Sequence, residues 1–562
     1  MKQKYGAFAN VHDQMDDDSK EDEELIANIV IMGVSLLLIG LVTIAFVSNI
    51  GGSKTEPIMK NIESICSKTE SSETCVHVLK HIGDRAPVLE YIKASLNVTL
   101  EEFFVVNIPK PLLEKFLTPL QAQSYRDCME LLNMGTDELN FLHMITNSAV
   151  EEVMRVDPKD IVNSLSAIIS YQQTCANELV RTNSYEILGY SLSIPILLTR
   201  MTLAIVENFV DIPYVDDREL DGFKKFQSRA SEPKLGDEKT IKVVAKDGSG
   251  NFTSITESLH ACAMNTKESC VIYVKKGKYE ERVVIPNNLD QVFMYGDGPM
   301  DTIVTGITIR DPMVVTPFQS ATFVVKGKGF ICKDMGFIAP ANVAGAPALL
   351  VLSDRAVFFN CLIDGQEGSL YAVAHRQFYR DCEIRGSVDI IKGDSATLIQ
   401  NSKIIVKHRN SSNLGLRKNV VSAQTRLDKY ERTGLVIQNC TIVAEQGENG
   451  NDSLVSSTCL GAPRNEYSRT IVMESFLGDV IRPKGWCRWS DNYGIDTATF
   501  REYDNRGPGA ENNKRVHWES YRTISQNQRL DMKSFTADKF IQADQWLKHT
   551  GIPYEAGLLI HK

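Results

Sequence analysis

The chain lacks the excess of basic residues that nucleic-acid binding requires. Its 562 residues carry a net charge of −10, whereas binding a phosphate backbone needs Lys and Arg gathered on one face. It has 12 cysteines but no CxxC pair and no His/Cys cluster with zinc-ligand spacing. We therefore expect no nucleic-acid partner, no metal and no other cofactor, and we assign paired cysteines to disulfide bonds.

Disorder is not indicated either, since 43% of the residues are hydrophobic and 23% are charged, close to globular averages. The length suggests two to four domains, or fewer if one of them is a large repetitive unit.

No charged residue occurs from Leu25 to Ile50. As a helix this segment would cover roughly 39 Å, more than the ~30 Å hydrocarbon core of a bilayer. Cleaved secretory signals usually have apolar cores of only about 7 to 15 residues. We therefore expect a transmembrane signal-anchor at 25–50, with a cleaved signal as the alternative, preceded by an acidic cytosolic tail at 1–24.

Five Asn-X-Ser/Thr glycosylation acceptors all lie beyond this apolar segment. Together with the cysteines they place the rest of the chain in the secretory pathway, as a single-pass membrane protein or as a protein released outside the cell. The acceptors are Asn97, Asn251, Asn410, Asn439 and Asn451.

Residues 57–215 have helical periodicity, clearest from Asp160 to Val180, where apolar residues recur on one face. Similar faces at 112–131 and 196–210 predict a bundle of about four helices. Cys66 and Cys75 are close enough for a local disulfide, and Cys128 and Cys175 could join two helices.

Three features of this region carry a resemblance: the order of its cysteines, Tyr125-Arg-Asp-Cys-Met-Glu130 and Ser166-Ala-Ile-Ile-Ser-Tyr-Gln-Gln-Thr-Cys175. In these features the region is similar to the plant invertase and pectin methylesterase inhibitor family. The resemblance allows two roles, an active inhibitor or an intramolecular pro-region that silences the following domain. We favour the pro-region, because it is covalently attached to its presumed target. Residues 216–240 are a charged linker with a basic pair at Lys224-Lys225, where a protease could cut, although the family's tighter basic site is missing.

Residues 241–562 contain short β-branched or aromatic runs between Gly, Asn and Asp turns, with no helix-length segment between them. A Cys-X-Ile unit recurs at Cys361, Cys382 and Cys440, with a looser match at Cys332 and a serine version at Ser402. The intervals of 29, 21, 20 and 38 residues fit coils of one length plus insertions. We predict a right-handed parallel β-helix in which these cysteines form a buried ladder.

This domain resembles the plant pectin methylesterases from about Lys242 to Leu558. The resemblance rests on motifs in the family's order, and it implies the β-helix fold and hydrolysis of methyl esters of cell-wall homogalacturonan. The motifs are Lys246-Asp-Gly-Ser-Gly-Asn-Phe252, Gly277-Lys-Tyr-Glu-Glu281, Arg376-Gln-Phe-Tyr-Arg380, Gly386-Ser-Val-Asp389, Gly507-Pro-Gly-Ala510 and Thr550-Gly-Ile-Pro553.

The chemistry needs an ionised carboxylate as nucleophile, a protonated carboxyl for the leaving methoxide, amide donors for the oxyanion and a cation that orients the nucleophile. In the family these roles fall to two aspartates, two glutamines and an arginine. Carried over by position, the resemblance keeps only the nucleophile, Asp389. The acid falls on Gly368, the glutamines on Glu367 and Gly345, and the arginine on Ala462.

Other substitutions make the expected cleft more basic. Lys392 and Arg464 stand where the family has aromatic residues, and Tyr371 keeps a family tyrosine, so we expect these three to contact substrate. Glu367 could replace the missing acid if the segment were shifted by one residue, but a slip reverses the face of each side chain and requires a bulge. We expect a protein like the pectin methylesterases that acts on homogalacturonan methyl esters of the cell wall with weak or no catalysis. The alternatives are a non-catalytic pectin-binding or regulatory protein, an esterase using Asp389 with Glu367, or an inhibitor acting in trans through the helical domain.

Overall fold

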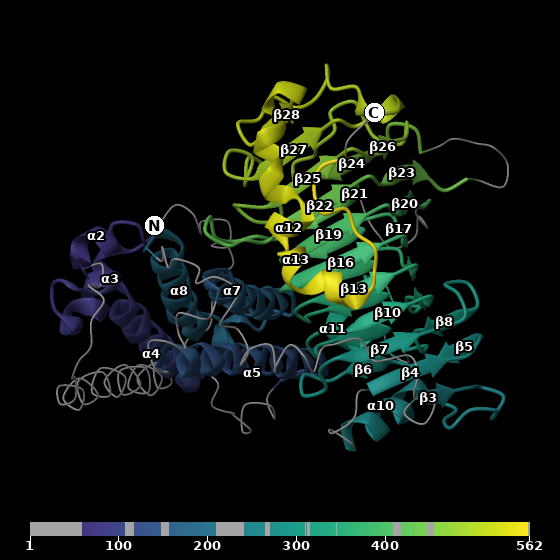
Figure 1. The fold of residues 1–562 in the computed structure, drawn as a ribbon, viewed down its shortest axis with the longest axis horizontal. Coiled ribbons are helices and arrows are strands. Elements are labelled where there is room, and N and C mark those ends of the chain that lie inside the picture. The colour runs from purple at the N-terminus through teal and green to yellow at the C-terminus, as the bar shows by residue number, and fades with distance from the viewer. Residues whose placement is uncertain are drawn as a thin grey trace, which may run out of the picture.

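The computed structural model describes residues 59–106, 117–147, 157–209, 241–264, 270–309, 311, 315–343, 345–408, 418–446 and 454–559 (Figure 1). The expected cytosolic tail, the expected membrane span at 25–50 and the linker at 216–240 lie outside these residues. Among the helices that are described, none is both long and apolar enough to cross a bilayer.

The N-terminal region is helical, as predicted, and its four long helices pack against one another. α7 begins where the sequence favours a helix start, because the Asp157 side chain accepts a hydrogen bond from the Lys159 N–H and Pro158 occupies the first turn. Its buried face includes Leu165 and Ile168. The helices are α2 (Ile62–Cys66), α3 (Ser72–Leu79), α4 (Val88–Val106), α5 (Pro119–Asn147), α7 (Pro158–Arg181) and α8 (Tyr185–Phe209), with a 3-10 turn η1 (Lys80–Ile82) and a small antiparallel pair β1 (Met59–Lys60) and β2 (Ala86–Pro87).

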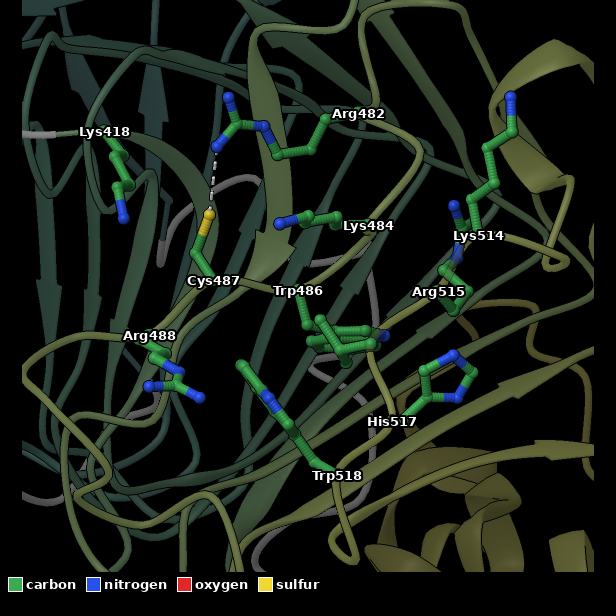
Figure 2. Close-up of a pocket in the computed structure, with 11 residues that line it drawn as sticks. Lys418, Arg482, Lys484, Trp486, Cys487, Arg488, Lys514, Arg515, His517 and Trp518 are labelled. Atoms are coloured by element: carbon green, nitrogen blue, oxygen red, sulfur yellow. Dashed lines mark hydrogen bonds between the residues drawn. The ribbon is translucent and has the colours of Figure 1, made fainter.

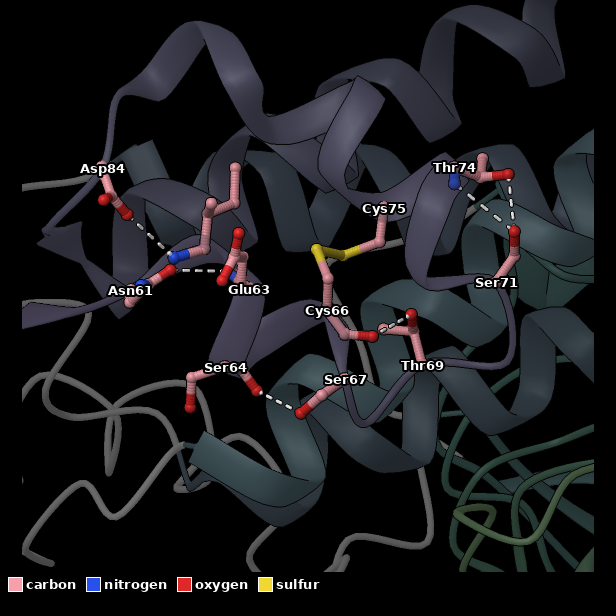
Figure 3. The surroundings of a disulfide bond; sticks show 11 residues. Asn61, Glu63, Ser64, Cys66, Ser67, Thr69, Ser71, Thr74, Cys75 and Asp84 are labelled. Atoms are coloured by element: carbon pink, nitrogen blue, oxygen red, sulfur yellow. Dashed lines mark hydrogen bonds between the residues drawn. A yellow bond between two sulfur atoms is a disulfide. The ribbon is translucent and has the colours of Figure 1, made fainter.

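Two disulfide bonds hold this region together, and both join cysteines that the sequence suggested as partners. Cys66 and Cys75 are linked between α2 and α3, where the Ser71 hydroxyl caps α3 (Figure 3). Cys128 of α5 is linked to Cys175 of α7.

The C-terminal region is a parallel β-helix of three sheets, which confirms the predicted fold. The first sheet contains β3 (Ile241–Val244), β4 (Cys270–Val274), β7 (Val292–Tyr295), β10 (Ile331–Lys333), β13 (Ala356–Phe359), β16 (Arg376–Arg380), β19 (Ala396–Gln400), β22 (Gly434–Gln438), β25 (Arg469–Met473), β27 (Thr499–Tyr503) and β28 (Tyr521–Ile524). The second contains β5 (Gly277–Glu280), β8 (Thr302–Thr305), β11 (Gly336–Ile338), β14 (Leu362–Asp364), β17 (Glu383–Gly386), β20 (Lys403–Val406), β23 (Thr441–Ala444) and β26 (Phe476–Leu477). The third contains β6 (Val283–Ile285), β9 (Phe323–Val325), β12 (Leu349–Val351), β15 (Leu370–Ala372), β18 (Ile391–Gly393), β21 (Asn419–Gln424) and β24 (Thr458–Gly461).

The recurring cysteine unit marks the turn from the first sheet to the second. In each coil an Asn or Asp adopts a left-handed conformation, with φ of 50° at Asn360, 52° at Asp381 and 52° at Asn439. These residue types tolerate this conformation better than others do. The next residue then points into the core, so Cys361, Cys382 and Cys440 are buried and unpaired, and the predicted ladder is confirmed for these three. Cys332 is also buried and unpaired, but it lies within β10 opposite Phe358, and Met335 follows the left-handed Asp334 of that coil.

Two features of this region were not predicted. A ten-residue helix, α10 (Ile255–Met264), lies between β3 and β4, so the expectation that no helix-length segment interrupts the strands was wrong. Its buried residues pack on the N-terminal coil, which has no preceding coil to cover its core. Two further disulfides join Cys262 to Cys270 and Cys459 to Cys487. The remaining short helices are α11 (Pro317–Ser320), α12 (Ala537–Phe540), α13 (Ala543–Trp546), η6 (Pro508–Ala510), η7 (Gln526–Phe535) and η8 (Leu547–Thr550).

The helical region packs on the third sheet of the β-helix (Figure 1). A single cluster of buried apolar residues includes helix residues such as Leu165 and sheet residues Val324 and Leu350. The Ser170 hydroxyl of α7 donates to the Val373 carbonyl over 2.5 Å. Because the third sheet also carries Tyr371 and Lys392, the helices lie on the face that bears the expected substrate site.

Candidate functional site

Asp389 lies in the turn between β17 and β18, and only 1% of its surface is exposed. Neighbouring coils hold this turn on both sides. The Val388 N–H donates to the Gln366 carbonyl of the preceding coil over 3.2 Å, and the Ile390 N–H donates to the Val420 carbonyl of the following coil over 3.0 Å. Asp389 itself has a φ of 48°, a conformation uncommon for residues other than glycine. The carboxyl group is therefore presented by a rigid backbone.

Arg464 forms an ion pair with Asp389, through Nη2 and Oδ2. The guanidinium carbon of Arg464 also lies 3.2 Å from the ring centroid of Trp489, so the ring faces a cation. Ala462, where the family's arginine was expected, is buried beside Cys459 and Cys487. A cation thus reaches Asp389 from a position two residues further along the chain, and the sequence comparison missed it.

Lys392 occupies the space in which a side chain at position 368 would begin. A Cβ built on Gly368 would lie 2.8 Å from the Lys392 Nζ and 2.7 Å from its Cε. The same ammonium lies 4.6 Å from the ring centroid of Tyr371. Burial lowers the pKa of Lys392, against the opposing effects of Glu367 and Asp389. A lysine from the next coil therefore fills the position at which the resemblance to the family leads us to expect a proton donor.

The pairing between these two coils is regular. Leu362 pairs with Glu383, Glu367 with Val388 and Leu370 with Ile391, each 21 residues apart, so no bulge separates these positions. With the same spacing, Gly368 stands opposite Asp389, as the ungapped comparison expects. The one-residue shift that would make Glu367 the acid has no bulge to support it.

Glu367 is instead directed toward Gly345. A Cβ built on Gly345 would lie 3.7 Å from the Glu367 carboxyl carbon. Gly345 has a φ of 74°, where a larger residue is strained. The region expected to hold amide donors therefore holds a carboxyl group, and its charge acts on Lys392.

Helix α7 reaches the edge of this site. Burial raises the pKa of Tyr371, and the charge of Glu178 on α7 raises it further. Glu178 is paired with Arg181 over 2.8 Å. A hydrogen bond with Thr174 opposes both effects. Tyr371 also contacts Phe318 edge to face, with ring centroids 6.0 Å apart. The helical region thus contributes polar groups next to Tyr371 and Lys392.

Three of the five expected glycosylation acceptors lie within the described residues. Asn251 is exposed, although its side-chain oxygen accepts a hydrogen bond from the Val243 N–H. Asn97 is half-buried inside α4, and Asn439 is half-buried with its amide donating to Asn401. Asn410 and Asn451 lie outside the described residues. Asn251 therefore presents the most accessible of the three side chains.

Comparison with known proteins assigns each of the two regions to a family. The family model described as Pectinesterase matches residues 241–544, and the one described as Plant invertase/pectin methylesterase inhibitor matches residues 60–203. Relatives include the probable pectinesterase/pectinesterase inhibitor 13 of Arabidopsis thaliana, 34% identical over 89% of this chain and 82% of that protein. The pectinesterase/pectinesterase inhibitor PPE8B of Prunus persica is 36% identical over 77% of this chain and 83% of that protein.

Among solved structures, the pectin methylesterase from carrot superposes with a TM-score of 0.52 at 36% identity, over 56% of this chain and 98% of that one. Both the sequence matches and the shared β-helix therefore place the chain in one family. This protein belongs to the pectinesterase family of carboxylic ester hydrolases and carries an N-terminal domain like the plant invertase/pectin methylesterase inhibitors.

Proposed function

We propose that this protein binds homogalacturonan in the plant cell wall and hydrolyses its methyl esters weakly or not at all. The observation that carries this proposal is the position of Lys392, whose side chain fills the space where a side chain at Gly368 would begin. An ammonium beside Asp389 attracts carboxylates, which are the products of the family's reaction. The positions at which the family has its second aspartate and its two glutamines hold Gly368, Glu367 and Gly345, so the leaving group and the oxyanion lose their usual donors.

An active esterase is the second candidate, and one observation favours it. Arg464 contacts Asp389 as the orienting cation of the family would, so the nucleophile retains its partner. In that case the proton for the leaving methoxide would come from Lys392, whose pKa is lowered by burial, or from Glu367. A non-catalytic regulatory protein that uses the same cleft is the third candidate.

Methanol release from methylated pectin separates these candidates. The assay uses residues 241–562. This segment contains the β-helix, and the match to that part of the protein covers 98% of the carrot pectin methylesterase chain. Efficient release, at the rate of an active pectinesterase, that disappears in Asp389→Ala would refute the proposal and support the esterase. No release, together with retained binding to de-esterified pectin, supports the proposal and eliminates the esterase.

The helical domain is proposed to act as a pro-region that restricts access to the cleft. This role is supported by polar contacts between the two domains, in addition to the apolar cluster that they share. They include Arg376 to Asp160 at 2.7 Å, Lys328 to Glu138 at 2.6 Å, Gln319 to Asp127 at 2.5 Å and Arg200 to Asp428 at 2.6 Å. Inhibition of other esterases in trans is the alternative, and residues 57–215 added to an active pectinesterase would test it.

The proposed organisation therefore has five parts: tail 1–24, signal-anchor 25–50, pro-region 57–215, linker 216–240 and β-helix 241–562. Secretion is supported by the cell-wall substrate of the family. Fractionation of plant membranes would test the anchor: recovery of the intact chain in the soluble wall fraction alone would refute it.

A further inference from the structure

A basic pocket lies near the C-terminal end of the third sheet, outside the Asp389 site. Its volume is about 590 Å³. Six of its lining residues are Lys or Arg, from three separate segments, and no Asp or Glu lines it. They are Lys418, Arg482, Lys484, Arg488, Lys514 and Arg515.

This concentration of charge is not neutralised within the part of the chain that the structure describes. Arg515, which also lines the pocket, is paired with Glu502 over 2.8 Å, but Lys418, Lys484 and Arg488 have no such ion pair among the described residues. The whole chain has a net charge of −10, so a pocket of one positive sign is unusual for its surface. Like charges that face one cavity attract anions and raise their local concentration.

The pocket also has a fixed shape and aromatic walls. The Arg482 Nη1 lies 3.6 Å from the Cys487 sulfur, which places this guanidinium over the Cys459–Cys487 disulfide (Figure 2). Figure 2 shows Arg482 and Lys484 directed toward the side of the pocket on which Lys418 lies. Trp518, which is half-buried, contributes an aromatic surface to the same pocket. Cations next to an indole suit a ligand that is both anionic and ring-shaped.

One short segment contributes residues both to this pocket and to the surroundings of Asp389. Trp486 pairs with Gly461 at the end of β24, and the Cys487 N–H donates to the Gly461 carbonyl over 2.9 Å. Three residues after Trp486, Trp489 faces Arg464, the partner of Asp389. A linear polymer lying along the third sheet could therefore contact both sites at once.

We propose that this pocket is a second binding site, which takes the free carboxylates of de-esterified homogalacturonan. The inference rests on the proposed function, because it takes the same polymer as ligand. Each unesterified sugar unit carries one carboxylate, whereas a methyl ester is neutral and gains little from Lys418, Lys484 and Arg488. The protein should therefore bind stretches of pectin that have already lost their esters. Among the described residues, the helical domain packs against β6 to β15 and against Leu427 and Tyr430, and none of its residues lines the pocket.

The test compares binding of the full chain to de-esterified and to fully methyl-esterified oligogalacturonides by calorimetry at low ionic strength. The variant Lys418→Gln/Lys484→Gln/Arg488→Gln removes three exposed charges, and the control Lys533→Gln/Lys539→Gln/Lys548→Gln removes three exposed lysines elsewhere. We expect the pocket variant to bind the de-esterified ligand about ten-fold more weakly, because each of the three exposed charges contributes less than about 1 kcal/mol to binding. Binding of the esterified ligand and the thermal unfolding midpoint should stay unchanged.

Equal loss in the control variant, or no loss in the pocket variant, would overturn the inference. Equal affinity for a sulfated dextran of the same charge density would also overturn it, since the pocket would then recognise charge alone. The proposed function is judged separately by methanol release. If wild-type protein releases methanol efficiently while the pocket variant still loses affinity, the second site stands and the proposed function falls. If the pocket variant binds normally and no methanol is released, the proposed function stands and the second site falls.

Discussion

The position of Lys392 predicts that a two-residue exchange should create or increase esterase activity. The change is Gly368→Asp with Lys392→Leu, made in residues 241–562. It returns a carboxyl to the position opposite Asp389 and removes the ammonium that fills this space. Arg464 is untouched and still holds the nucleophile.

The structure sets the expected magnitudes. Gly368 has a φ of 61°, so a side chain there costs about 1 kcal/mol of folding stability. Its Cβ would meet only the end of the Lys392 side chain, at 2.7 Å, and the leucine removes that contact. With the lysine gone, repulsion from Asp389 raises the pKa of the introduced carboxyl and favours its protonated form. General acid catalysis contributes about 10² to 10⁴-fold, and because the glutamines are still missing we expect an increase of about 10-fold or more in methanol release.

The assay measures methanol from methylated pectin between pH 5 and 8, with urea unfolding to confirm that the variants fold. Lys392→Leu alone should release no more methanol than wild type, and Asp389→Ala in the double variant should abolish the gain. If Lys392→Leu alone loses activity that wild type has, lysine is the proton donor and the reasoning fails. If the folded Gly368→Asp/Lys392→Leu variant releases no more methanol than Lys392→Leu alone, the lack of a carboxyl at position 368 is not what limits the activity.

Three further predictions concern stability and domain contact. Arg464→Gln should lower the free energy of unfolding by about 2 kcal/mol, because the Asp389 carboxylate stays buried without its cation, whereas Arg464→Lys should recover part of this loss in urea titrations. Burial raises the pKa of Asp394 to about 6, against the lowering effects of its hydrogen bonds with Thr433 and Glu431. Because the folded pKa exceeds the unfolded one, the stability contributed by the protonated Asp394 is complete below about pH 4 and is lost as the pH rises through about 6. Asp394→Asn should flatten that part of the pH dependence of the urea midpoint, and an unchanged slope would contradict the assignment. Asp160→Asn removes the partner of Arg376 in the contact between the two domains. After cleavage of the linker, the helical domain should therefore dissociate about 3- to 10-fold more readily, as measured by gel filtration or calorimetry. The control Asn177→Asp, on the exposed side of α7, should leave this dissociation unchanged.

Local patterns were sufficient to predict the elements of the fold. The Asn-Cys and Asp-Cys units at 360–361 and 381–382 imply a left-handed turn followed by a core position, and this rule depends only on neighbouring residues. The helix at α7 was predicted for the same reason, since its period and its start are local. The helix α10 and the Cys459–Cys487 disulfide were missed, because they depend on which surfaces remain uncovered once the coils have stacked. The Cys262–Cys270 disulfide was also missed, although its cysteines are as close in the sequence as Cys66 and Cys75.

The sequence by itself determined which chemical groups the site has lost. The side chains of Gly368, Gly345 and Ala462 cannot act as proton donor, amide donor or cation in any fold. Only the tertiary structure decided what replaced them: Arg464 reaches Asp389 across 75 residues of chain, and Lys392 fills the space at Gly368 from the next coil. The physical reason is that stacking of coils brings together side chains from distant positions, and the length of the side chains decides which of them meet. A comparison position by position detects the loss of a group, whereas a replacement from another coil becomes visible only when the coils are stacked.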